Sequence, residues 1–281
     1  MNYKNRTIRF GLLLIAMAVA FAACKKTDRP ALGDYPKDSN PPGGPLKFYA
    51  SFEAEKAGFV FDSIKANFGS PTDASIVDGG VTGKAFQGTN NGFIVFPSAN
   101  DFANSTSFTV SFWIKTTLAQ KDNVNADGIL TLASANNFWG NMTWYADHTT
   151  GGNSDSMDLK VHWANGSGDN WDFAGYTGNA RWPGMYDGNW HDVVFVYDAN
   201  SKTATLYKDG VQFDQKTNET IQFDGAASSL IVGGFEQAAN IQGDYADNTW
   251  MSGFPGLIDN IRLYGEALSP SDVQALYANK E

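Results

Sequence analysis

The chain has 281 residues, of which 42% are hydrophobic and 18% charged, so it is not a disordered chain and it is long enough to bury a large core. Its 14% aromatic residues and 29 glycines favour many short strands joined by tight turns over a helical bundle. Without the three basic residues of the first 23 positions, 17 basic groups face 30 acidic ones, and a net charge of −13 excludes a nucleic-acid-binding role.

The first 23 residues have the pattern of a secretory signal. A short basic stretch precedes apolar residues 11–21, which are too few to span a bilayer as a permanent helix. The stretch ends in Phe21-Ala22-Ala23-Cys24, which contains the chain's single cysteine. This ending resembles the lipobox of bacterial lipoproteins, although leucine is commoner than phenylalanine at its first position. The resemblance implies a lipoprotein signal peptide over 1–23 and lipidation of Cys24; a plain secretory signal is the alternative.

Residues 24–45 predict a disordered, proline-rich tether. Residues 25–45 hold five of the ten prolines, and proline blocks both helix formation and sheet pairing. Such a spacer reaches at most roughly 60 Å, at about 3.1 Å per residue. We therefore expect an outer-membrane lipoprotein of the cell envelope, surface-exposed, which contacts the membrane through its lipid anchor only.

From residue 46 onward the chain has the periodicity of β-strands. Residues 108–115 alternate with period two, and residues 190–197 are nearly all apolar, as in a central strand that is buried on both faces. Asp209-Gly210 predicts a hairpin turn between strands at 203–208 and 211–214. Further strands are expected at 129–132, 158–163, 229–232 and 257–264.

One helix is expected, at the C-terminal end. Ser269 has the position of an N-cap, Pro270 that of the first helical residue, and Asp272 completes a capping box. About a dozen strands without βαβ alternation, followed by one short helix, predict a single all-β sandwich.

The order of short motifs over 46–281 carries a family resemblance. In sequence order the motifs are Gly83–Phe86, Gly92–Phe96, Ser107–Lys115, Asp187–His191, Leu206–Gly210, Ile231–Gly234, Gly256–Tyr264 and Ala267–Ser269. They resemble the laminin-G-like jellyroll domain of the concanavalin-A-like lectin/glucanase superfamily. The resemblance implies a two-sheet antiparallel jellyroll over 46–281, with about six or seven strands in each sheet. It also implies a concave sheet that often binds carbohydrate.

Catalysis has weaker support in the sequence. Retaining glucanases of this fold carry a Glu-x-Asp-x-(x)-Glu run, which places paired carboxylates about 5 Å apart on one strand face. The sequence contains no such run; its nearest acidic pairs are Glu53/Glu55, Asp155/Asp158 and Asp169/Asp172. His191 is expected to make a structural hydrogen bond, and His148 with His162 is a weak candidate for a metal pair. The sequence therefore leans away from an enzyme.

A binding role has better support in the sequence. Residues 138–186 hold five of the eight tryptophans, interleaved with Asn, Asp, Gly and Ser. Flat aromatic rings stack on the apolar faces of sugars, whose hydroxyl groups need amide and carboxylate partners. The predicted ligand-binding residues are Trp139, Trp144, Trp163, Trp171, Tyr176, Trp182 and Trp250. The alternative is that these rings form a buried satellite cluster; Trp113 and Trp190 are expected in the core.

Calcium is the cofactor that the resemblance implies. Proteins of this kind often hold a structural Ca²⁺ on the convex side, through an aspartate of the Gly-x-Ile-Asp strand and backbone carbonyls. Asp259 matches that aspartate, and Phe52 and Gly88 lie near the carbonyl positions. Hydrogen bonding of Asp259 to backbone amides is the alternative.

The first functional hypothesis is a non-catalytic carbohydrate-binding lipoprotein that captures a polysaccharide or oligosaccharide, alone or beside a neighbouring glycan-uptake complex. The second is an adhesion or assembly module that binds a protein through the same face. The third is a glycoside hydrolase or lyase with an atypical site.

Overall fold

The computed structural model describes residues 45–53, 60–61, 64–65, 67–68, 74–121, 124–147, 155–165, 181–224, 229–241 and 248–280. The chain divides into two units, residues 1–34 and 35–281, and every described residue belongs to the second. The predicted signal peptide, Cys24 and the tether up to residue 44 lie outside the described residues. Within these ranges, no helix has both the length and the apolar character needed to cross a membrane.

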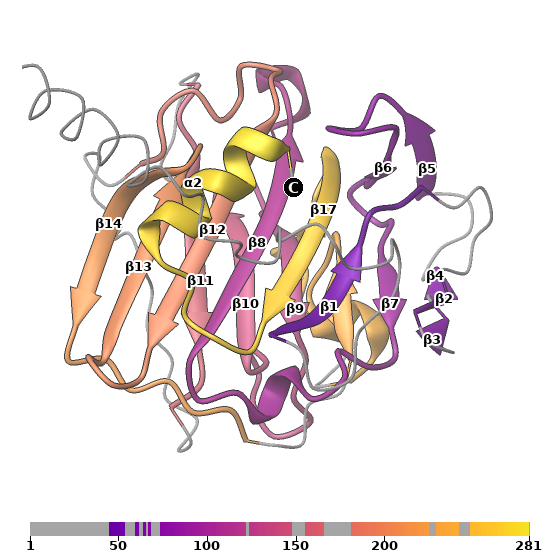
Figure 1. Cartoon of the computed structure of the whole chain (residues 1–281). Helices are drawn as coiled ribbons and strands as arrows, with labels where there is room; N and C mark the ends of the chain where they lie inside the picture. Colours follow the sequence, from indigo (N-terminus) through magenta and orange to yellow (C-terminus); the bar gives the residue numbers. More distant parts are fainter. Residues whose placement is uncertain are drawn as a thin grey trace, which may run out of the picture. The chain divides into compact units, whose positions relative to one another are not determined.

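Two sheets pack face to face and confirm the predicted all-β sandwich (Figure 1). The eight-stranded sheet has the order β14-β13-β12-β8-β17-β6-β5, with β1 also paired to β17. Its strands are β1 (Leu46–Ala50), β5 (Ser75–Asp78), β6 (Lys84–Gln87), β8 (Phe108–Lys115), β12 (His191–Asp198), β13 (Thr203–Lys208), β14 (Val211–Thr217) and β17 (Leu257–Tyr264).

The seven-stranded sheet has the order β11-β10-β9-β15-β7-β4, and β16 lies beside β9 as the one parallel pair among the described strands. Its strands are β4 (Asn67–Phe68), β7 (Ile94–Phe96), β9 (Ala126–Leu132), β10 (Met142–Asp147), β11 (Asp158–Trp163), β15 (Leu230–Val232) and β16 (Met251–Gly253). A separate two-stranded ribbon pairs β2 (Val60–Phe61) with β3 (Ile64–Lys65). Three 3₁₀ helices connect strands: η1 (Phe102–Asn104), η2 (Leu118–Gln120) and η3 (Glu236–Ala239).

The core lies between the sheets, where aromatic side chains from both meet. Phe112 of β8 meets Trp144 of β10 edge to face, with ring centroids 5.2 Å apart. Phe195 of β12 contacts both Trp144 and Trp163, at 5.7 and 5.8 Å. The period-two pattern of β8 therefore points its phenylalanines inward, as predicted.

The second face of β8 is buried too, because helix α2 (Pro270–Asn279) lies across the eight-stranded sheet (Figure 1). The predicted capping box is present, and the Ser269 side chain accepts a hydrogen bond from the backbone N–H of Asp272. Tyr277 stacks on Trp113 at 5.6 Å, and the Asn260 amide donates to the carbonyl of Lys280 (2.9 Å). These contacts cover the outer face of the eight-stranded sheet around β8 and β17.

The β13–β14 hairpin confirms the predicted Asp-Gly turn. Asp209 and Gly210 both have positive φ, 52° and 74°, as a two-residue turn of the mirror-image type requires. Asp209 also accepts from the His191 ring: its Oδ2 lies 2.9 Å from Nδ1. Asp187 lies 3.2 Å from the other ring nitrogen, so the structural role predicted for His191 is confirmed. Because this histidine is held between two carboxylates, its pKa is raised although burial opposes the rise.

Candidate functional site

Side chains alternate between the core and the outer face along β10 and β11. Trp144 and Trp163 point into the core and are 1% and 0% exposed, so the prediction that they bind ligand is wrong. The reason is their register: each lies on the face of its strand that meets Phe195 of the opposite sheet. Their neighbours Tyr145 and His162 therefore occupy the outer face.

The other predicted aromatic residues divide into three groups. Trp182 is also buried, stacked on Phe213 at 4.5 Å, so its prediction as a ligand residue is wrong as well. Trp171 and Tyr176 lie outside the described residues, and their roles remain predictions. Trp139 and Trp250 reach the surface. Of the two tryptophans expected in the core, Trp113 is fully buried, whereas Trp190 is half-buried and its indole N–H donates to the Gly79 carbonyl (3.3 Å).

Six aromatic side chains gather on the outer side of the seven-stranded sheet. We call them the outer-face cluster: Phe138, Trp139, Tyr145, His162, Phe235 and Trp250. They come from the loop before β10, from β10 and β11, and from the segments that precede η3 and β16. Residues separated by more than 100 positions in the sequence thus form one aromatic cluster, in which Tyr145, His162 and Phe235 are buried and Trp139 packs against them half-buried, so that the satellite cluster considered in the sequence analysis is present in part.

The base of the outer-face cluster is a stack of three rings. Trp139 lies parallel to the His162 ring, with centroids 4.3 Å apart and planes inclined by 4°. Tyr145 lies 5.5 Å from Trp139, and a hydrogen bond of 2.9 Å joins its hydroxyl to Nε2 of His162. His148, the other half of the weakly predicted metal pair, lies outside the described residues. In this structure His162 orients Trp139.

The rim of the outer-face cluster is open to solvent. Phe138 is 37% exposed and Trp250 is 39% exposed, two of the few large apolar side chains with such exposure among the described residues. Trp250 lies 5.5 Å from Trp139 and 6.4 Å from Phe138. Adjacent exposed aromatic rings are unfavourable in water, so this rim is the part of the cluster at which a ligand could gain by covering apolar surface.

Helix η3 holds the loop that carries Phe138 and Trp139. The Glu236 carboxylate accepts the backbone N–H of Ser134 (2.8 Å), and the Gln237 amide donates to the carbonyl of Phe138 (2.7 Å). Both side chains are buried. Burial raises the pKa of Glu236 to about 8, although backbone N–H groups that donate to it act in the opposite direction. The exposed rings therefore stand on a fixed loop.

A second set of hydrogen bonds joins the same loop to Asp224. The Asn141 amide donates to Asp224 Oδ1 (3.0 Å), and its carbonyl oxygen accepts the backbone N–H of Asp224 (2.8 Å). Ser134 donates its hydroxyl to the other carboxylate oxygen of Asp224. The loop is thus tied to two segments that are distant in the sequence.

Two acidic residues face each other near the outer-face cluster. Asp147 of β10 and Asp158 of β11 are register partners, so their side chains share a face. Lys160 donates to Asp147 at 2.5 Å, and its ammonium group also lies 5.9 Å from the Tyr145 ring. Asp158 is 3% exposed and Lys160 is fully buried. Lys160 thus compensates the charge of one carboxylate of this facing pair.

The predicted calcium residue Asp259 lies at the loop between β5 and β6. Its carboxylate accepts the N–H groups of Val81 and Asn260, each at 2.7 Å. Burial raises its pKa to about 7, and the negative charge of Glu53 adds to this rise. Glu53 approaches the same loop and accepts the N–H of Lys84 (3.3 Å). Both carboxylates thus accept backbone N–H groups, as in the alternative that the sequence left open for Asp259, and among the described residues no group of three or more His, Cys, Asp and Glu side chains is placed to hold a metal ion.

The two other residues predicted for calcium are placed differently. Phe52 is buried with φ of 57°, and this left-handed turn directly precedes Glu53. Gly88 instead contacts Gly256, whose carbonyl accepts its N–H (2.9 Å), and its own carbonyl accepts from the Gln87 amide (2.8 Å). The acidic side chains at this loop are therefore Asp259 and Glu53, and the sequence analysis did not connect Glu53 with Asp259.

Sequence reasoning also missed Tyr145, His162 and Phe235 as parts of the outer-face cluster. For two of them a signal existed: Tyr145 and His162 alternate with Trp144 and Trp163 on strands whose inward positions are apolar. No local signal marks Phe235, which joins the cluster through the pairing of β15 with β9.

Comparison with known proteins agrees with this architecture. Residues 87–274 match the family described as the concanavalin A-like lectin/glucanases superfamily, under the name Laminin_G_3. No curated protein matches the chain.

Several solved structures have the same fold. One is domain 4 of AbnA, an extracellular arabinanase from Geobacillus stearothermophilus, which was solved in complex with arabinotriose. Its sequence is 20% identical to this chain, with a TM-score of 0.54, and the match covers 83% of this chain and 98% of that domain. The binding domain of Paraclostridial Mosquitocidal Protein 1 is 20% identical with a TM-score of 0.55, over 84% of this chain and 52% of that one. At these identities the likeness concerns the fold alone. On its family match, the chain belongs to the concanavalin A-like lectin/glucanase superfamily.

Proposed function

We propose that this protein is a non-catalytic carbohydrate-binding lipoprotein of the outer membrane, which captures a polysaccharide or oligosaccharide at the cell surface. The observation that carries the proposal is the outer-face cluster, with the exposed rings of Trp250 and Phe138 beside the stacked Trp139. Stacking of sugar C–H faces on such rings, with nearby amides for the hydroxyl groups, is the usual chemistry of glycan recognition.

Two further parts belong to the proposal. The lipobox-like Phe21–Cys24 supports a lipid anchor at Cys24, followed by a proline-rich tether that lifts the domain from the membrane. Glu53 and Asp259 both reach the segment 81–84, and the charge of Glu53 helps to raise the pKa of Asp259; this juxtaposition of like charges supports a structural Ca²⁺ held between the two carboxylates.

Affinity electrophoresis tests the binding function. The panel comprises linear arabinan, xylan, galactan, mannan and mixed-linkage β-glucan. We expect retardation by at least one of them, and a loss of at least tenfold in affinity, about 1.4 kcal/mol, in Trp139→Ala and Trp250→Ala. Trp190→Ala is the matched control, because this half-buried tryptophan lies on the eight-stranded sheet's side, at Gly79.

Near-ultraviolet circular dichroism and a thermal melt of each variant establish that it folds. Unretarded migration of the folded wild-type protein on the whole panel would refute the binding function. A pull-down that yields one stoichiometric protein, insensitive to added sugar, would instead identify the protein-binding module that the sequence also allows.

The facing pair Asp147 and Asp158 favours a glycoside hydrolase as the second candidate. In retaining glycosidases the two carboxyl groups are about 5–5.5 Å apart, which is the spacing of cross-strand neighbours. The buried ion pair of Asp147 with Lys160 argues against it, because one carboxylate is already engaged. Reducing sugar released from any panel member, and abolished in Asp158→Asn, would establish catalysis and overturn the non-catalytic assignment.

A further inference from the structure

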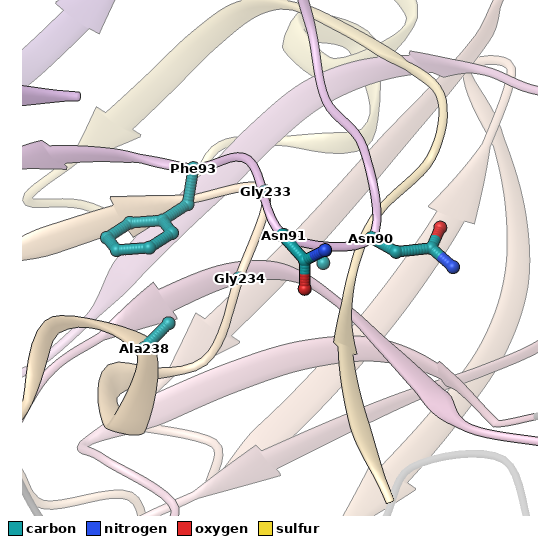
Figure 2. A pocket seen from close by; sticks show the side chains of 7 residues that line it. Asn90, Asn91, Phe93, Gly233, Gly234 and Ala238 are labelled. Carbon is teal, nitrogen blue, oxygen red and sulfur yellow. The ribbon is translucent and has the colours of Figure 1, made fainter. Parts of the chain in front are cut away.

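A small pocket lies next to the outer-face cluster. Its volume is about 100 Å³, and it is lined by Asn90, Asn91, Phe93, Gly233, Gly234, Ala238 and Gly253. In the view of Figure 2 the Phe93 ring and the Ala238 methyl group lie on one side of Gly234 and the Asn91 amide on the other. The pocket therefore combines an apolar wall, a backbone floor and side-chain amides.

The floor of the pocket is rigid backbone. Gly253 donates its N–H to the carbonyl of Asn90 (2.7 Å), and a Cβ on Gly253 would lie 2.3 Å from the carbonyl oxygen of Thr89. Gly233 has φ of 80°, and a Cβ there would lie 2.6 Å from the Phe86 ring. Only glycine fits at these two positions, because the chains approach too closely for a side chain.

The pocket and the outer-face cluster adjoin each other along the chain at two places. On η3, Ala238 of the pocket donates its N–H to the carbonyl of Phe235, a ring of the cluster (3.1 Å). Gly253 of the pocket, on β16, follows Trp250 of the cluster, in the turn before β16, by three residues, so their Cα atoms are at most roughly 11 Å apart. A short oligosaccharide that covers Trp250 and Trp139 can therefore extend a further unit into the pocket.

The side chains that line the pocket are uncharged. None of its seven lining residues carries a charge, and the amides of Asn90 and Asn91 are on exposed residues. A carboxamide offers two donor hydrogens and an acceptor oxygen, which matches hydroxyl groups that both donate and accept. The Phe93 ring, which is half-buried, suits the C–H face of a sugar.

The surroundings of the pocket are acidic. Among the described residues, the strands of the seven-stranded sheet and η3 carry four acidic side chains, Asp127, Asp147, Asp158 and Glu236, and one basic side chain, Lys160. The described part of this sheet thus carries a net negative charge. Such a field repels uronate and sulfate groups and leaves neutral sugars unaffected.

We infer that the pocket is a second subsite and that the ligand is an uncharged glycan of at least two sugar units. The glycan lies across the outer-face cluster and inserts one sugar unit, or a side group of it, into the pocket. This inference rests on the proposed carbohydrate-binding function and specifies its substrate class.

Two variants on η3 test the subsite. Ala238→Leu fills the pocket, whereas Ala239→Leu adds the same side chain one residue later, at a position that does not line it. Isothermal titration with oligosaccharides of one to six units of arabinose, xylose, galactose, mannose and glucose measures affinity against length. We expect wild-type affinity to rise with length, and Ala238→Leu to lose at least tenfold for the longer oligomers, with Ala239→Leu unchanged. Asn91→Ala, at an exposed turn, is a second variant that leaves the packing intact and should weaken the same oligomers.

Three outcomes overturn the inference. If Ala238→Leu and Asn91→Ala bind every length as the wild type does, while Trp139→Ala and Trp250→Ala lose binding, the pocket is no subsite and the proposed function stands. If polygalacturonate or alginate binds the wild type as tightly as the neutral polymers, the ligand is not restricted to uncharged glycans, and again the proposed function stands. If no oligosaccharide or polymer binds the wild type, the proposed function fails together with this inference.

Discussion

Glu236 shows how one buried carboxyl group controls a loop that carries exposed rings. Its pKa in the folded protein is about 8, above the ordinary value of 4.5, because burial disfavours the charged form. A raised pKa means that the folded state holds the proton more tightly than the unfolded state. The stabilising contribution is therefore complete below about pH 4.5 and is lost as the pH rises to about 8.

We expect Glu236→Gln to be as stable as the wild type near pH 5 and more stable at pH 9. The amide keeps a carbonyl oxygen for the N–H groups that donate to Glu236 and cannot ionise. The difference is on the order of 1.4 kcal/mol for each unit between the folded and unfolded pKa values. Urea unfolding at pH 5, 7 and 9 measures it, with the exposed Glu266→Gln as control. Identical pH profiles for wild type and Glu236→Gln would show that this carboxyl group does not ionise differently on folding.

At the scale of elements, carboxylates that accept backbone N–H groups link the β5–β6 loop to β17 and the start of β6 to the segment after β1. Asp259 accepts from Val81 and Glu53 accepts from Lys84, and the two negative charges oppose each other. A cation between them would relieve this repulsion and stabilise the folded state, by about 2.7 kcal/mol at a concentration 100 times its Kd.

The thermal unfolding midpoint should therefore fall when EDTA is added and recover with excess Ca²⁺. For a domain of this size each kcal/mol shifts the midpoint by about 2–4 °C. Asp259→Asn should remove the response, and the exposed Asp101→Asn should keep it. A wild-type midpoint that neither EDTA nor Ca²⁺ moves would contradict the calcium proposal.

Elements with a strong local pattern could be predicted from the sequence almost residue by residue. The strand at 108–115, the turn at Asp209-Gly210 and the capped C-terminal helix all match the structure, because period-two alternation, positive φ and a capping box are local properties. By contrast, the local sequence does not determine which face of a strand packs against the opposite sheet. Trp144 and Trp163 have polar neighbours in the sequence, yet Phe195 of the other sheet buries them.

The candidate site was predictable only in part, for the same reason. Trp139 and Trp250 were identified by composition, because large aromatic residues among Asn, Asp and Gly are unusual in a core. Their proximity, at 5.5 Å, depends on the parallel pairing of β16 with β9. A single parallel pair between residues 126–128 and 251–253 leaves no trace in either segment alone.

At the scale of the whole molecule, the proposed anchor has a direct test. Cys24→Ser removes the thiol that would carry the lipid, so we expect the variant to leave the membrane fraction of cells and to lose labelling by radioactive palmitate. Thr27→Ser, three residues further on, should behave as the wild type. Labelled, membrane-bound Cys24→Ser protein would show that the cysteine is incidental to a plain signal sequence.

The chain enters the sandwich through β1, and the backbone N–H of Gly265 donates to the carbonyl of Pro45 at that entrance (2.7 Å). This strand belongs to the eight-stranded layer, whereas the aromatic rings lie on the other layer. With the proposed tether joined to β1 and the proposed glycan bound on these rings, a pulling force on the glycan must cross from one layer to the other. This force is therefore borne by the phenylalanine and tryptophan side chains that pack between the two sheets. A weakened interior would lower the force that the protein withstands while its ligand is bound.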